Sequence, residues 1–136
     1  MITSPTFPTQ PTVLLYHPDG SERLKKIRGY LEKHGIRLSV VPPEDYLQPI
    51  ASLLGLPGIE RRPVQTAGNP IREEMMLMFG FQGSMMHDFL QFFREEGIAS
   101  IQRKAVATPT NLFWDSVQLY EELSRESEWF SQNRKD

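Results

Sequence analysis

The chain has 136 residues, no cysteine and a formal net charge of −2. Its length suits one domain with a substantial core, and the lack of cysteine excludes disulfides, thiolate metal ligands and cysteine nucleophiles. The near-neutral charge gives no electrostatic drive toward nucleic acid or anionic membranes. Residues 1–11 carry no signal-peptide pattern, and no segment is apolar enough to span a membrane. We therefore expect a cytoplasmic protein with a disordered lead over residues 1–11.

The first half alternates predicted strands and helices. A short apolar run predicts a strand over residues 12–17, and an amphipathic pattern predicts a helix over 21–34. Alternating polar and apolar residues predict a second strand over 37–41. Pro49 suits the first turn of a short helix that reaches Leu54.

The second half repeats this order after a linker. Proline, glycine and polar residues predict an irregular connection over residues 58–74. Residues 127–136 are expected to form a tail, from which Trp129 and Phe130 are large enough to dock back. The other predicted elements are a strand at 75–79, a helix at 84–96, a strand near 104–107 and a helix after Thr110 and Asn111 that turns Phe113 toward the core.

The two halves resemble each other in sequence. A shift of 62 (97 minus 35) superimposes the two predicted helix ends and the apolar stripes of the two helices. Further on, Pro43 matches Pro109 at a shift of 66 (109 minus 43), which requires a short insertion near residues 99–103. We interpret residues 12–57 and 75–126 as duplicated βαβα units within one globular domain.

This order predicts an α/β fold with a four-stranded sheet. The first and third strands are apolar throughout and belong at the centre, which favours the strand order 2-1-3-4 with mostly parallel strands and helices packed on the sheet. Two alternatives stay open. One is a ferredoxin-like arrangement with helices on one face only, and the other is a pseudo-twofold that makes the central pair antiparallel.

The segment from Glu74 to Glu122 resembles a small uncharacterised bacterial family, a domain of unknown function. The resemblance lies in a helix closing at Gly97-Ile98, in the string Lys-Ala-Val-x-Thr-Pro-Thr-Asn over residues 104–111, and in a helix containing Trp114. The N-terminal half is similar to the companion half of longer members. The resemblance implies this fold and a bacterial origin, and it implies no activity.

The first candidate site comprises two strand-to-helix turns. His17, Asp19 and Ser21 follow the first strand, and Ser84 follows the third. If all strands are parallel, both turns lie beside one crevice at the carboxyl edge of the sheet, where free amides at the helix starts could hold an anion. In the alternative interpretation, glycine and serine only form the turns and cap the helices.

The second candidate site is the string that contains Thr108, Thr110 and Asn111. Two hydroxyls and an amide at a strand end could bind a ligand, yet a tight turn and a helix cap require the same groups. The matching residues of the first half, Pro42 to Asp45, keep the turn with different polar groups. That comparison favours a structural role.

These residues favour a protein without catalysis of its own. His17, His34 and His87 lack metal-ligand spacing, so we expect no metal, no cofactor and no catalytic set. Nucleic-acid binding is disfavoured, because the basic residues of the first helix are interspersed with glutamates. A surplus of methionine and phenylalanine in the second half favours a protein-interaction or regulatory module that binds itself, as in a homodimer, or another protein. The alternative is a protein, or a minor enzyme, that binds an anionic metabolite at the crevice.

Overall fold

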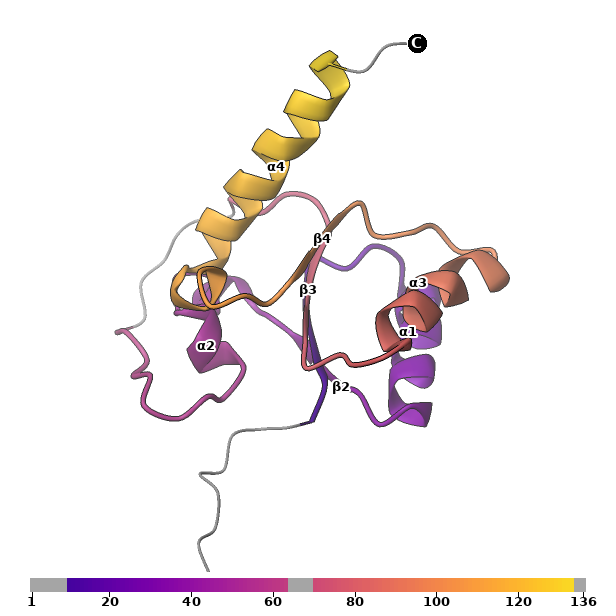
Figure 1. Cartoon of the computed structure of the whole chain (residues 1–136), viewed down its shortest axis with the longest axis horizontal. Helices are drawn as coiled ribbons and strands as arrows, with labels where there is room; N and C mark the ends of the chain where they lie inside the picture. Colours follow the sequence, from indigo (N-terminus) through magenta and orange to yellow (C-terminus); the bar gives the residue numbers. More distant parts are fainter. Residues whose placement is uncertain (1–9, 64–69, 134–136) are drawn as a thin grey trace, which may run out of the picture.

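The computed structural model describes residues 10–63 and 70–133, with side chains as far as residue 126. The predicted order of strands and helices is confirmed, with two additional short 3-10 turns, η1 and η2. The expected lead and linker fall partly outside the described residues. In chain order the elements are β1 (Thr12–Tyr16), α1 (Ser21–Lys33), β2 (Arg37–Val40), η1 (Pro43–Asp45), α2 (Ile50–Leu53), β3 (Met75–Phe79), α3 (Met85–Glu95), β4 (Arg103–Val106), η2 (Asn111–Phe113) and α4 (Ser116–Asn133) (Figure 1).

The four strands form one sheet in the predicted order β2-β1-β3-β4. The β1–β2 and β3–β4 pairs are parallel, whereas the central β1–β3 pair is antiparallel. The expected α/β fold with a mostly parallel sheet is confirmed, and the central pair adopts the pseudo-twofold alternative. Each parallel pair is joined by one helix, which forms the crossover connection that parallel strands require. The connection from β1 to β3 is much longer and imposes no direction.

The two halves of the sheet correspond position by position about the central pair. Leu14 of β1 lies opposite Leu77 of β3, its own counterpart at a shift of 63 (77 minus 14). The edge strands correspond at the larger shift of 66 (103 minus 37), so the second half holds a short insertion before β4. This agrees with the insertion expected there. That the correspondence arose by internal duplication stays a prediction.

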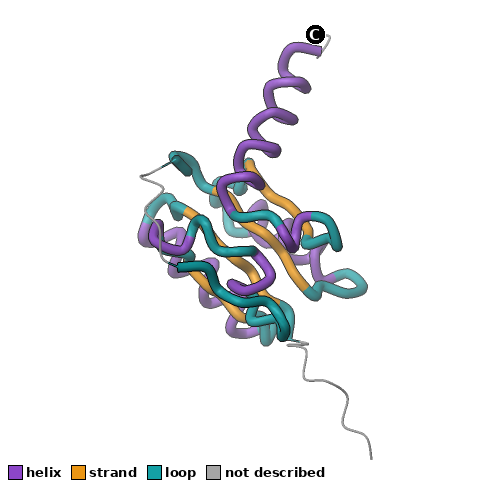
Figure 2. Tube along the Cα trace, turned by 90° about the vertical axis from the view of Figure 1, so that its left-hand side faces the viewer, coloured by secondary structure: helices purple, strands orange, loops and turns teal. Residues whose placement is uncertain are grey.

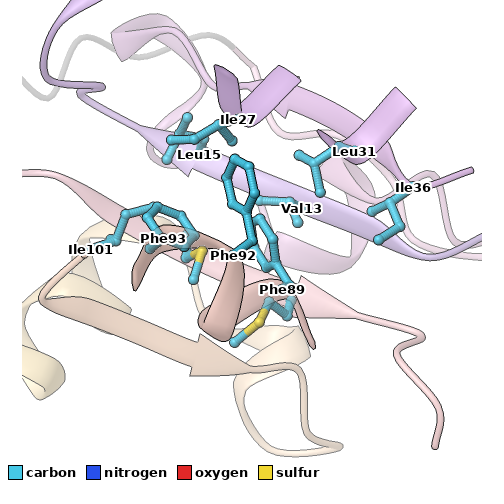
Figure 3. Close-up of a cluster of buried hydrophobic side chains, with 11 residues drawn as sticks. Val13, Leu15, Ile27, Leu31, Ile36, Phe89, Phe92, Phe93 and Ile101 are labelled. Atoms are coloured by element: carbon cyan, nitrogen blue, oxygen red, sulfur yellow. The ribbon is translucent and has the colours of Figure 1, made fainter. Parts of the chain in front are cut away.

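Helices cover both faces of the sheet, so the two-layer alternative with helices on one face is not formed (Figure 1). On one face, α1 and α3 pack over the central strands. Phe89 and Phe92 of α3 meet Ile27 and Leu31 of α1 in this cluster (Figure 3). Tyr30 of α1 joins them, with its ring centre 4.5 Å from that of Phe92. Aromatic contacts therefore hold the two helices side by side.

The opposite face is covered by α2 and the first turns of α4. The starts of these helices meet, because the Ile50 amide donates to the Trp114 carbonyl at 2.8 Å. Beneath them, the hydroxyls of Tyr16 and Ser116 form a buried hydrogen bond of 2.7 Å. This bond links β1 of the first half to α4 of the second.

The last helix begins later than the sequence predicted. Asp115 and Gln118 form a reciprocal cap in which each side chain accepts the other's backbone N–H at 2.9 Å. Phe113 was expected to face the core but precedes the helix and is 64% exposed.

The backbone of α4 continues through Asn133, over most of the segment expected to be a tail, and projects away from the sheet (Figure 2). The side chains of Trp129 and Phe130 lie outside the described residues. Among the described helices, none combines the length and the apolar character that crossing a membrane requires.

Candidate functional site

The antiparallel central pair separates the two predicted turns. Ser21 begins α1 just after β1, while Ser84 precedes α3 just after β3. Because β1 and β3 are antiparallel, their carboxyl ends point in opposite directions along the strands. The crevice expected between the two serines is therefore not formed. Neither side chain caps its helix, and the Ser84 hydroxyl instead donates to Asp88 at 2.9 Å.

A cleft of about 490 Å³ opens at the end of the sheet where β1 finishes and β3 and β4 begin. His17 and Asp19 line it, so the structure brings these two predicted residues together. The other five predicted residues, Ser21, Ser84, Thr108, Thr110 and Asn111, are not among its lining residues. The lining comprises His17, Asp19, Arg23, Arg72, Glu73, Glu74, Ala99, Ser100, Gln102 and Arg103.

Arg23 and Glu74 form a part-buried ion pair in the lining of this cleft. Their side chains are only 13% and 11% exposed, and the Arg23 guanidinium donates to Glu74 at 2.5 Å. Two further guanidinium nitrogens donate to the Ala99 carbonyl at 2.9 and 2.7 Å. The Asp19 amide donates to the same glutamate at 3.1 Å. This network joins the β1–α1 turn, the start of β3 and the loop before β4.

Arg103 forms a second link on the α4 side of the cleft. Its guanidinium donates to Glu73 and, at 3.0 Å, to the Ser124 hydroxyl, and it lies over the Tyr120 ring. Three charged or titratable side chains in the cleft remain. Within the described part of the chain, no hydrogen bond or ion pair engages the side chains of His17, Asp19 or Arg72. They supply one imidazole, one carboxylate and one guanidinium.

His17 adopts a left-handed backbone conformation, and its counterpart in the second half is a glycine. His17 has φ 51°, and Gly80, which occupies the matching place after β3, has φ 78°. A Cβ on Gly80 would lie 3.3 Å from the Cα of Pro11. Positive φ is uncommon for residues other than glycine, although histidine tolerates it better than most. The first half thus carries an imidazole where the second packs backbone against backbone.

The Thr-Pro-Thr-Asn string folds into a turn held by its own hydrogen bonds, and it covers one carbonyl on the outer edge of β4. The side-chain oxygen of Asn111 accepts a hydrogen bond from the backbone N–H of Thr108 at 2.8 Å. The backbone N–H of Asn111 donates to the Thr108 hydroxyl at 3.0 Å. Asn111 Nδ2 also donates to the Val106 carbonyl at 3.0 Å. The Ala107 amide donates inward to β3, so the groups of Val106 point outward. Thr110 is exposed and precedes η2.

The matching edge of β2 is open. The amides of Arg37 and Val41 donate inward to the segment of β1, so the backbone groups of Leu38 and Val40 point outward. Within the described residues, no hydrogen bond reaches those outward groups. Val40 is 39% exposed.

Asp45 takes the place of Asn111 in the first half, which accounts for the uncovered carbonyl of Val40. Both residues follow their edge strand at the same distance along the chain, at a shift of 66 (111 minus 45). A carboxylate cannot donate to the Val40 carbonyl, and it accepts instead from Arg61 at 2.7 Å. Sequence reasoning missed this edge. The change from asparagine to aspartate after the two edge strands was the signal that could have revealed it.

The histidines do not assemble. His34 lies against the Tyr30 ring, with ring centres 4.1 Å apart, and His17 lies in the cleft. Across the parts of the chain that the structure describes, no group of three or more histidine, aspartate or glutamate side chains could hold a metal ion.

Comparison with known proteins finds a family match in the second half. Residues 74–130 match a family described as a domain of unknown function (DUF3783). The match runs from the residue before β3 into α4, so it covers the second βαβα unit. This supports an uncharacterised domain family, while the bacterial origin and the string at 104–111 as its signature stay predictions. No curated protein and no solved structure matches the chain.

Proposed function

We propose that the protein is a non-enzymatic protein-interaction module that accepts an added strand at the outer edge of β2. The observation that supports this most is the difference between the two edge strands. On β4, Asn111 covers the outward carbonyl of Val106 and leaves the Val106 N–H and the outward groups of Lys104 without a partner in the described residues. On β2, none of the outward groups of Leu38 and Val40 has a partner there. An unpaired edge is a template for another strand.

The side chains at this edge support a protein partner as well. Each edge strand presents an exposed valine, Val40 at 39% on β2 and Val106 at 47% on β4, so the exposed side chain suits a protein partner and the backbone groups favour β2. An added strand would bury Val40 while supplying backbone hydrogen bonds, and the alternate side-chain positions would give specificity.

The experiment is a selection of extended peptides against the immobilised full chain, followed by affinity measurements on two matched variants. Val40→Pro and Val106→Pro each remove one outward-facing N–H from an edge strand, where proline is tolerated. Val40→Pro should weaken binding at least ~10-fold, and Val106→Pro should leave it unchanged. Circular dichroism checks that both variants fold. Equal loss in both variants, or no selected peptide together with no self-association, would overturn the proposal.

The cleft favours a second candidate function, the binding of a small anionic metabolite. Arg72 and His17 offer donors to a carboxylate or phosphate, since no ion pair engages Arg72 within the described residues. A cleft of about 490 Å³ is large enough for such a molecule.

A thermal-shift screen with phosphates, nucleotides, carboxylates and amino acids tests the cleft, with Arg72→Gln as the matched variant. A saturating ligand should raise the melting temperature of the parent chain and not of the variant. A flat response across the panel would retire this candidate.

A further inference from the structure

We propose that the strand added to β2 comes from a second copy of this chain, and that the two β2 strands pair antiparallel about a twofold axis at Ser39. The result is a dimer with one continuous eight-stranded sheet. This inference rests on the proposed function, because it names the partner of the same edge.

The backbone of β2 is self-complementary in this arrangement. Leu38 and Val40 both direct N–H and C=O outward, so Leu38 of one copy faces Val40 of the other and the pair exchanges two hydrogen bonds. The twofold repeats this exchange, which gives about four bonds in all. Ser39 then faces its own copy at a non-hydrogen-bonded position. Pro42 lacks an N–H and ends the ladder.

The side chains of this register are compatible. Leu38 and Val40 lie on the face of the sheet that α1 covers. Across the twofold, the side chain of Leu38 in one copy lies next to that of Val40 in the other. Contact between them buries Val40, which is 39% exposed in the single chain. Arg37 faces Val41 of the other copy, so no like charges stand directly opposite each other.

The helices that flank the edge also carry both signs of charge. In the dimer the two α1 helices lie about two strand spacings apart, roughly 10 Å, which is an ordinary distance between packed helices. The side of α1 turned away from Tyr30 and α3 carries Lys25, Arg28 and Glu32, which lie roughly 140–160° around the helix from Tyr30. Antiparallel helices bring the lysine of one copy toward the glutamate of the other, so the flank presents complementary charges.

The partly covered edge of β4 favours a closed dimer over a longer assembly. If both edges of the sheet were open, β2 of one copy could also pair with β4 of the next, and such head-to-tail contacts extend into fibres. Asn111 occupies the outward carbonyl of Val106, so a strand added to β4 would lose one of the hydrogen bonds that β2 offers. A twofold contact through β2 alone closes on itself.

Disulfide cross-linking can test the dimer without interference from other thiols, because the chain has no cysteine. At a non-hydrogen-bonded antiparallel position the two Cα atoms lie about 4.5 Å apart, which is within disulfide reach. Ser39→Cys should therefore yield a covalent dimer on mild oxidation. Ala105→Cys is the matched control, since Ala105 occupies the same place on β4 that Ser39 occupies on β2. Thermal denaturation of the reduced variants checks their folding.

Sedimentation equilibrium of the full chain supplies the second measurement. Val40→Lys should raise the dimer dissociation constant at least ~10-fold, and Val106→Lys should not change it. Equal cross-linking of both cysteine variants, or a monomeric parent chain at high micromolar concentration, would overturn the dimer. A monomeric parent that still binds selected peptides through β2 would overturn only the second copy as the partner. Failure of both experiments would overturn the proposed function too.

Discussion

The two halves of the sheet have the same strand and helix order but use different polar groups around it. In the first half, Arg23 reaches across to the second half, His17 occupies the turn after the central strand, and the outer edge of β2 is open. In the second half, Gly80 packs tightly in the matching turn and Asn111 covers the outward carbonyl of Val106 on β4. The shared backbone is therefore set by the apolar pattern, while the polar differences lie in the turns, the cleft and the outer edges of the sheet.

The largest effect is expected at Arg23, whose counterpart in the second half is Met85 near the start of α3. Arg23→Met removes a part-buried guanidinium, which leaves Glu74 with only the Asp19 amide as a donor and the Ala99 carbonyl without its partner. Loss of one member of an ion pair costs about 3 kcal/mol or more when the pair is buried and at most about 1 kcal/mol when it is exposed, so this part-buried pair should cost about 2–3 kcal/mol. Urea denaturation should show a drop of this size in the free energy of unfolding.

Arg125→Met serves as the control for Arg23→Met. Arg125 pairs with Glu122 on the surface of α4, with side chains 67% and 40% exposed. Such a pair contributes at most about 1 kcal/mol. Similar losses in the two variants would mean that the cleft network does not join the halves.

The turn after each central strand gives the next comparison. Gly80→Ala forces a side chain into a positive-φ position and toward the Pro11 backbone 3.3 Å away, so it should cost about 2 kcal/mol. His17→Gly should have the opposite sign and raise the unfolding free energy by up to about 1 kcal/mol, because it relieves the same strain. Chemical denaturation measures both. A destabilising His17→Gly would indicate that the imidazole makes a contact that offsets its backbone strain.

The polar pair beneath α4 gives a smaller effect. Tyr16 corresponds to Phe79 at the end of β3, and Ser116 corresponds to Ile50 at the start of α2, so the other half has apolar residues at both places. Tyr16→Phe leaves the buried Ser116 hydroxyl without its partner and should cost about 1–2 kcal/mol. Thermal or urea denaturation measures the loss, and adding Ser116→Ala should recover part of it. Additive losses would show that the hydrogen bond contributes nothing of its own.

The same tyrosine predicts how stability depends on pH. Burial raises the pKa of Tyr16 above its ordinary value, and the hydrogen bond from Ser116 offsets only part of this rise. The unfolded tyrosine loses its proton near pH ~10 while the folded one retains it, so stability is present below that pH and falls above it. Tyr16→Phe should make the alkaline decline of the melting temperature less steep. Burial also raises the pKa of Tyr30 and Tyr46, so some decline should persist.

The sequence predicts the fold well where local pattern determines it. Apolar periodicity was enough for the strands, the helices and the order of the sheet. The direction of β3 was not predictable, because the long connection from β1 permits either direction. The predicted helix started directly after Asn111, so it included Phe113 and turned it toward the core. The capping pattern of Asp115 and Gln118 in the sequence indicates the later start that the structure shows.

The cleft was harder to predict than the strands. Arg23 and Glu74 lie far apart in the sequence, and no local pattern pairs two charges across such a separation. The sequence singled out His17 and Asp19 for a crevice formed with Ser84, whereas the residues that actually join them come from the start of β3 and the loop before β4. Only the antiparallel register of the central strands determines which loops share an edge.

The smallest effect sharpens the comparison of the two helices over the sheet. Gly29 lies in the middle of α1, where α3 has Gln91 at the matching position, and a Cβ added to Gly29 meets nothing within 4 Å. Glycine in a helix interior costs about 1 kcal/mol relative to alanine. Gly29→Ala should therefore raise the unfolding free energy by up to about that amount, as measured by urea denaturation at low protein concentration. A loss of stability would mean that something beyond the described residues packs closely against α1.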